Sequence, residues 1–257
     1  MRKLSVYIIA KNEARRIRRT LVAARKVADE IVVVDSGSTD DTVKIAEGLA
    51  DRVVFRQWTS YSDQKHYAQE LCSNDWVLMD DADEVITDRL ADEINLWNRQ
   101  EDDGVFAYRF KIVSVYPGER GPKRFAECVR EIRLYNRKHA DLCAEDLTND
   151  RVTVAPGARV GCFRNPVAHF SYMSLEQVIN KLNQYTTESL EKRNGRHYPL
   201  IRLFVEGPLN FVRAYLLGRC FLHGVLGLIA AYNYAHFRWV KQAKDYERRI
   251  KEKSERI

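Results

Sequence analysis

The stretch Trp76-Val77-Leu78-Met79-Asp80-Asp81-Ala82-Asp83-Glu84 decides how this chain folds and where its chemistry lies. Its first residues are apolar, which is typical of a strand that enters a protein core. Four carboxylates follow within five residues, and their mutual repulsion at a sheet edge has to be offset by a cation or by hydrogen bonds. The spacing of Asp81 and Asp83 suits an oxygen-preferring ion such as Mg²⁺ or Mn²⁺. The alternative is a solvated acidic turn before a helix.

The residues around this stretch predict alternating strands and helices. Such an alternation predicts right-handed βαβ units and a mainly parallel sheet, which binds ligands at the C-terminal ends of its strands. Polar residues follow those ends in three loops, at 11–13, 35–38 and 80–84. The expected strands are 4–10, 30–35, 52–55 and 76–79, and the expected helices are 13–27, 42–49, 63–71 and 88–97. In the first of these helices, the sides other than the apolar face carry Arg15, Arg16, Arg18 and Arg19.

The pattern changes after residue 100. Strands expected at 105–113, 129–135 and 164–172 follow no further βαβ repeat, so we expect them to extend the sheet with antiparallel pairs. We predict one α/β domain over residues 1–198, with halves at 1–100 and 101–198, and a helical tail over 199–257. Four helices are expected from Ser174 onward. The first begins at Ser174, and the others are 200–217 with an interruption at Gly207-Pro208, 221–234 and 236–253.

Composition describes a globular protein with a basic tail. The 257 residues are 45% hydrophobic and 30% charged, and the net charge is +6. From Lys192 onward there are fourteen Lys and Arg but only five Asp and Glu, interspersed with aromatic residues. This tail suits a helix in a bilayer interface that is attracted to an anionic membrane surface, and the alternative is packing on the domain. No nucleic-acid-binding motif accompanies the charge, so we expect no nucleic acid partner.

Several features indicate a cytoplasmic protein. The five cysteines form no C-x-x-C pair, and their odd number favours free thiols in a reducing compartment. The apolar run Val6–Ala10 is too short for a signal peptide, and Val225–Tyr232 is too short to span a bilayer.

Asp35 ends a strand and precedes Ser36-Gly37-Ser38 at a helix start. A carboxylate there can accept hydrogen bonds from a base or from ribose, and Gly37 permits close approach of the backbone. The alternative is that Asp35 only caps the turn. A G-x-G-x-x-G run and a P-loop are both absent from the sequence, which argues against a dinucleotide-binding Rossmann site and a P-loop site.

Three motifs together resemble family 2 glycosyltransferases of the GT-A fold. They are Ile9-Ala10-Lys11-Asn12-Glu13, the segment 31–42 around Asp35, and the segment 75–84 around Asp81 and Asp83. Within that family the chain looks most like the lipopolysaccharide core β-1,4-glucosyltransferase branch, and residues 167–172 extend the resemblance to about Arg193. The resemblance implies a Rossmann-like nucleotide-binding sheet of mixed parallel and antiparallel strands with a C-terminal helical extension.

The resemblance also implies roles for single residues. A divalent metal, Mg²⁺ or Mn²⁺, and a nucleotide-sugar donor are the implied cofactor and substrate. A solvated lysine is the alternative for Lys65, and a packing role is the alternative for His169. The implied roles are donor binding by Asn12, Glu13, Asp35 (to the uridine), Gly37, Lys65 and Asp81 (to the ribose or metal), and metal binding by Asp83, Asp81 and His169.

The catalytic base is expected in the second half of the domain. The lipopolysaccharide branch shows Val-His-Glu where this chain has Thr148-Asn149-Asp150, so Asp150 is the first candidate, followed by Asp146 and Glu145. The alternative is an ordinary acidic surface loop. One base without a protein nucleophile implies inversion at the anomeric carbon.

The resemblance therefore implies a metal-dependent inverting hexosyltransferase that uses a UDP-sugar. Its acceptor would be a lipid-linked saccharide such as the lipopolysaccharide core, and the enzyme would lie peripherally on the inner face of the cytoplasmic membrane. Two alternatives remain at this point: sugar transfer to a polyprenyl phosphate, and a catalytically silent nucleotide-binding membrane adaptor.

Overall fold

The computed structural model of the protein describes residues 1–101, 103–142, 151–171, 175–191, 193 and 197–254. The chain forms two compact units. The first is Met1–Val115, Glu119–Pro122 and Glu127–Ser171, and the second is Tyr116–Gly118, Lys123–Ala126 and Tyr172–Ile257.

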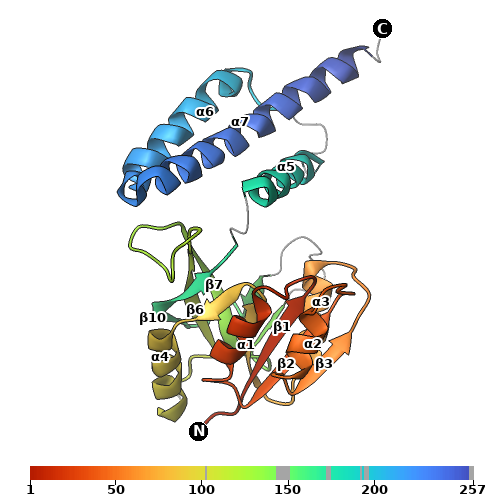
Figure 1. Cartoon of the computed structure of the whole chain (residues 1–257), viewed down its shortest axis with the longest axis vertical. Coiled ribbons are helices and arrows are strands. Elements are labelled where there is room, and N and C mark those ends of the chain that lie inside the picture. Colours follow the sequence, from red (N-terminus) through yellow and green to blue (C-terminus); the bar gives the residue numbers. More distant parts are fainter. Residues whose placement is uncertain (102, 143–150, 172–174, 192, 194–196, 255–257) are drawn as a thin grey trace. The chain divides into compact units, whose positions relative to one another are not determined.

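An eight-stranded sheet forms the centre of the first unit (Figure 1), in the order β3-β2-β1-β4-β7-β6-β10-β5. Strands β3, β2, β1 and β4 are parallel, whereas β7 is antiparallel to both β4 and β6. The predicted α/β fold with a mixed sheet is therefore confirmed. The strands are β1 Leu4–Ala10, β2 Glu30–Asp35, β3 Arg52–Phe55, β4 Trp76–Asp81, β5 Glu84–Ile86, β6 Ala107–Ser114, β7 Cys128–Asn136 and β10 Val160–His169, with a separate pair β8 Ala140–Leu142 and β9 Val152–Val154.

Helices cover the sheet because its central strands are apolar on both faces. All seven residues of β1 are buried. Leu4 and Val6 belong to one core cluster together with residues of α1 and α4, while Tyr7 and Ile9 belong to a second cluster that includes Ala68 of α3. The helices of this unit are α1 Ile17–Ala24, α2 Thr42–Glu47, α3 Tyr61–Glu70 and α4 Asp88–Arg99.

A two-residue connection makes the sheet curl. Only Ala82 and Asp83 separate β4 from β5, yet three other strands stand between them in the sheet order. Because two residues span less than about 8 Å, β7, β6 and β10 must bend round to bring β5 back to the end of β4. This curl brings the inner residues of β7 and the last residue of β10 to the β4–β5 turn.

The second unit consists of helices and the two short loop segments Tyr116–Gly118 and Lys123–Ala126. α6 and α7 lie side by side as a hairpin, and α5 packs on α7 (Figure 1). The contacts therefore divide the chain after Ser171 and not at the expected boundary after residue 198, since α5 belongs with α7. The elements are α5 Leu175–Glu191, α6 Ile201–Val212, the π-helical turn η1 Arg213–Leu217, the 3₁₀ turn η2 Cys220–His223 and α7 Gly224–Ser254.

The hairpin bends at a different place from the one that the sequence suggests. Pro208 lies inside α6 without ending it, because a proline removes one helical hydrogen bond but need not stop the helix. The helical run of α6 and η1 ends instead at Gly218, where a Cβ would lie 2.6 Å from the carbonyl oxygen of Ala214. Among the described residues, no single helix has the length and apolar composition of a membrane span, whereas 201–217 and 220–254, bent by 68°, meet that requirement as a pair.

Candidate active site

Four acids gather at the β4–β5 turn, at the C-terminal end of a parallel strand. Asp80 and Asp81 end β4, Asp83 lies in the turn and Glu84 begins β5. Asp80 and Glu84 are each only 2% exposed. The side chains of Asp81 and Asp83 are 28% and 18% exposed, so the D-x-D pair is the accessible half of this acidic cluster.

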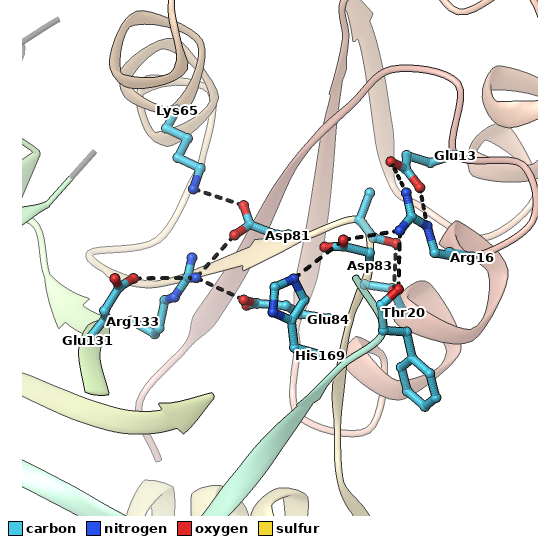
Figure 2. Close-up of polar contacts among 12 residues, drawn as sticks. Glu13, Arg16, Thr20, Lys65, Asp81, Asp83, Glu84, Glu131, Arg133 and His169 are labelled. Atoms are coloured by element: carbon cyan, nitrogen blue, oxygen red, sulfur yellow. Dashed lines mark hydrogen bonds and ion pairs between the residues drawn. The ribbon is translucent and has the colours of Figure 1, made fainter. Parts of the chain in front are cut away.

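Two buried basic side chains hold Asp81 (Figure 2). Lys65 of α3 places its Nζ 2.8 Å from Oδ1, and Arg133 of β7 donates from Nη2 to Oδ2 at 3.1 Å. The same nitrogen of Arg133 lies 2.9 Å from Oε1 of Glu84 and 3.6 Å from Oε2 of Glu131. Because an unpaired buried charge costs several kcal/mol, these bases and acids require one another.

Asp83 contacts a second set of partners. Its Oδ2 lies 3.4 Å from Nε2 of His169 and accepts a hydrogen bond from Nη1 of Arg16 at 3.2 Å. His169 ends β10 and is paired with Glu84 across the β5–β10 ladder. Arg16 also donates to both carboxylate oxygens of Glu13, at 2.5 and 2.6 Å, and thereby joins the loop after β1 to the acidic turn (Figure 2).

Burial weakens the negative charge of the two inner acids. Burial, followed by repulsion from Glu84, raises the pKa of Asp80 well above its usual range. Burial likewise raises the pKa of Glu84 to about 7, although attraction to Arg133 opposes this. One oxygen of each carboxyl is buried without a hydrogen-bond partner in the described part of the chain. A neutral carboxyl tolerates that situation better than a carboxylate.

The charge of the two outer acids is stabilised instead. Burial acts to raise the pKa of Asp81, but the charges of Lys65 and Arg133 outweigh it and hold the pKa below its usual range. Burial also acts to raise the pKa of Asp83, but the hydrogen bond with His169 and the charge of that ring outweigh it, and the pKa is lowered. The negative charge of the cluster is therefore concentrated on Asp81 and Asp83.

The loops after β1 and β2 are tied together. Asp35 accepts the backbone N–H groups of Gly37 and Ser38 at 2.8 and 2.9 Å, and the hydroxyl of Ser38 at 2.5 Å. Asn12 donates its backbone N–H to Oγ of Ser38 and accepts the N–H of Thr39, both at 2.8 Å. Gly37 has φ of +88°, a left-handed conformation that favours glycine. Asp35 thus closes its own turn, and its role in donor binding stays a prediction.

The structure brings most of the predicted site residues to one edge of the sheet. Lys65 is 2% exposed against Asp81 and is not a solvated helix lysine. The predicted bases Glu145, Asp146 and Asp150 lie outside the described residues. Two sets of polar contacts meet at the β4–β5 turn, one with Lys65 and Asp81 and the other with Asp83 and His169. The neighbouring loops contain Asn12, Glu13, Asp35 and Gly37.

Two basic residues were not predicted. Arg133 lies between Ile132 and Leu134 in β7, but the same strand also contains Arg130 and Glu131, so no local pattern singles Arg133 out. Arg16 was expected inside a helix that begins at residue 13, but the helix begins at Ile17 and leaves Arg16 at its N-terminal end, facing Asp83.

The donor atoms at Asp83 and His169 suit a divalent ion that takes most of its coordination from water and from a bound phosphate. Carboxylate oxygen is what Mg²⁺ and Mn²⁺ prefer, and the 3.4 Å between Asp83 and His169 is a separation that two ligands of one ion can have. The described residues contain no group of three His, Cys, Asp or Glu that could hold a metal. Such a site suits an ion that keeps positions for water and phosphate oxygens, as Mg²⁺ does.

The sequence comparison decides the family. The profile of glycosyl transferase family 2 matches residues 5–162, more than half of the chain, and includes the acidic cluster and both neighbouring loops. The chain belongs to glycosyl transferase family 2. Membership in this family confirms the resemblance that the three motifs indicate.

Relatives of this family 2 chain match it over nearly its whole length. An uncharacterized glycosyltransferase of Rickettsia prowazekii is 35% identical over 253 residues, which cover 95% of this chain and 87% of the relative. The lipopolysaccharide core biosynthesis glycosyltransferase LpsC of Rhizobium meliloti is 28% identical over 256 residues, 95% of this chain and 92% of LpsC. The crystal structure of S. aureus TarS 1-349 has a TM-score of 0.46 and 16% identity, with coverage of 95% and 89%.

Arg133 should be essential for stability because of Glu84. We expect Arg133→Met to lower the free energy of unfolding by about 3–5 kcal/mol, since it leaves buried acids without their cation. The double variant Arg133→Met/Glu84→Gln should recover part of this loss, while Glu131→Gln, which removes the more exposed partner, should cost less than about 1 kcal/mol. Urea unfolding measures all three. A double variant that is less stable than Arg133→Met would contradict this pairing.

Proposed function

We propose that this family 2 glycosyltransferase transfers a hexose from a UDP-sugar to a lipid-linked saccharide, in a metal-dependent reaction that inverts the anomeric carbon. The observation that carries the proposal is the concentration of negative charge on Asp81 and Asp83 at the C-terminal edge of the parallel strands. Buried and half-buried basic side chains surround these two acids. A metal ion bound to a diphosphate needs both kinds of group, carboxylates for the metal and basic side chains for the phosphates.

The turn after β2 would bind the uridine. Oδ1 of Asp35 accepts only the hydroxyl of Ser38 among the described contacts, and a carboxylate oxygen has capacity for a second donor, such as a base N–H or a ribose hydroxyl. Phe55 is 65% exposed, and its ring lies 3.6 Å from where a Cβ would stand at Gly37. It offers a flat apolar surface beside that turn, while Asn12 and Glu13 fix the neighbouring loop.

The acidic turn would bind the diphosphate end of the donor. Asp83 and His169 would hold Mg²⁺ or Mn²⁺, and Asp81 would turn from its basic partners to the same ion or to the ribose. The bound ion would neutralise charge that builds on the leaving diphosphate. Arg16 and Lys65 each contact one of these carboxylates in the structure. A carboxylate that turns to the ion releases its basic partner, so the same side chains can then bind phosphate oxygens.

The acceptor hydroxyl has to lose a proton, and a carboxylate of the 145–150 segment would take it. Asp150 is our first choice, before Asp146 and Glu145. The reaction then needs one base and no nucleophile from the protein, which leads to inversion.

A membrane-bound acceptor fits both the relatives and the tail. LpsC acts in lipopolysaccharide core biosynthesis, which supports a core saccharide as the acceptor. Phe204, Leu217 and Val225 of the hairpin are 72%, 78% and 72% exposed, and large exposed apolar surfaces mark interaction with membranes or partners. We propose that the protein lies peripherally on the inner face of the cytoplasmic membrane, where a cytoplasmic nucleotide sugar meets a lipid-linked acceptor.

Asp83 provides the first test. Purified protein, Mn²⁺, a set of UDP-hexoses and extracted core glycolipid should give sugar transfer, and Asp83→Asn should reduce it at least about 100-fold, because metal stabilisation of the transition state is worth several kcal/mol. Asp88→Asn is the matched control, since Asp88 is exposed and its side chain contacts only Lys26 among the described residues. Absence of transfer from every UDP-hexose by the unmodified protein would favour the silent adaptor.

Asp150 tests the kind of acceptor. Asp150→Asn should lower turnover about 100-fold to 10,000-fold, the usual contribution of a general base, and leave UDP binding unchanged in calorimetry. Asp146→Asn and Glu145→Gln, made in parallel, should have smaller effects. Normal turnover in all three variants would contradict the saccharide acceptor and favour polyprenyl phosphate, whose phosphate oxygen needs little help from a base.

A further inference from the structure

We propose that the tip of the α6–α7 hairpin and the loop before β7 together form a binding site for the phosphate group of a membrane lipid. All residues of this site belong to the same compact unit; they are Tyr116, Arg124, Phe125, Arg219 and His223. The inference rests on the membrane association within the proposed function and adds to it a defined phosphate site.

Two residues in strained conformations meet at this site. Phe125 has φ of 70° and Arg219 has φ of 58°, and among the described residues only Asn12, beside the candidate active site, shares this left-handed conformation without being a glycine. The guanidinium carbon of Arg219 lies 4.6 Å from the centre of the Phe125 ring. Such conformations cost about 1–3 kcal/mol each and cluster at ligand-binding sites, so their meeting here indicates a functional contact.

The site carries positive charge that the described residues do not neutralise. Arg124 also lies over the Phe125 ring, with its guanidinium carbon 4.9 Å from the ring centre. Both arginines are exposed, and neither forms an ion pair with an acid in the described part of the chain. Two like charges at one ring repel each other, and an anion that contacts both removes this repulsion. Guanidinium groups bind phosphate through two parallel hydrogen bonds, which makes phosphate the fitting anion.

His223 adds a donor at the same end of the hairpin, four residues after Arg219. Its ring centre lies 5.2 Å from that of Tyr116, so the hairpin tip contacts the loop at a second point. Both ring nitrogens are buried and have no hydrogen-bond partner within the described ranges. An imidazole always carries at least one N–H, so this buried donor requires an acceptor that the described side chains do not supply.

The surroundings indicate that the phosphate belongs to a lipid. Four exposed apolar side chains flank Arg219 in the sequence. They are Leu216 (55% exposed), Leu217 (78%), Leu222 (55%) and Val225 (72%). A free phosphate gains nothing from these side chains. A lipid phosphate at Arg219 would bring its acyl chains to them, and their burial contributes roughly 25 cal/mol per Å² of apolar surface removed from water.

Vesicle flotation of the full chain tests the site. We compare phosphatidylcholine vesicles that contain phosphatidic acid with vesicles given the same charge by oleate, a carboxylate lipid. We expect tighter binding to phosphatidic acid. Arg219→Gln and Arg124→Gln should each weaken that binding at least about tenfold, because they remove charge-assisted hydrogen bonds. Arg213→Gln, on the same hairpin but outside the cluster, should weaken it at most about fivefold, the effect of one diffuse surface charge.

A conservative variant separates charge from geometry. Arg219→Lys keeps the charge but not the paired donors, so it should bind both anionic vesicles nearly equally. Thermal unfolding confirms that each variant is folded. Equal losses in Arg219→Gln and Arg213→Gln, or equal binding of the unmodified chain to both anionic vesicles, would overturn the site, as would displacement by millimolar inorganic phosphate. Failure to bind any vesicle would overturn the membrane association as well, whereas sugar transfer in solution would remain unaffected.

Discussion

The connection of only two residues between β4 and β5 is the constraint on which the rest of this structure depends. It forces the sheet to curl, and the curl brings Arg133 of β7 and His169 of β10 to the acids of the turn. Arg133 and Lys65 in turn make the arrangement tolerable, because two buried and two partly buried carboxylates within five residues need internal cations beside them. The distribution of partners then leaves the charge on Asp81 and Asp83, where a ligand can reach it.

Much of this could be predicted from the sequence. Apolar runs mark β1, β2 and β4, and parallel strands place the loops that follow them side by side, so the gathering of Asn12, Asp35, Asp81 and Asp83 follows from local patterns. The contacts of Arg133 could not be predicted, because they depend on the register of β7 and on the curl of the sheet. Arg16 was misplaced because the start of α1 shifted by four residues from the expected one.

The tail illustrates the limits of local rules in another way. Pro208 suggests a break, but α6 continues through it and is followed by the turn η1, which ends where Gly218 packs on the preceding turn. The resulting bend gives the hairpin a tip with exposed leucines and Arg219. Composition alone predicts a basic, aromatic tail, whereas the contact of Arg219 with Phe125 joins segments almost a hundred residues apart and emerges only from the fold.

The central claim is that Asp81 and Asp83 form a metal-dependent site for a nucleoside diphosphate, and calorimetric titration with UDP tests it most directly. The protein should bind UDP in the presence of Mn²⁺, with an affinity that falls at least about tenfold, or about 1.4 kcal/mol, when EDTA removes the metal. Asp83→Asn should bind UDP equally weakly under both conditions. Equal affinity of the unmodified protein with Mn²⁺ and with EDTA would contradict the account.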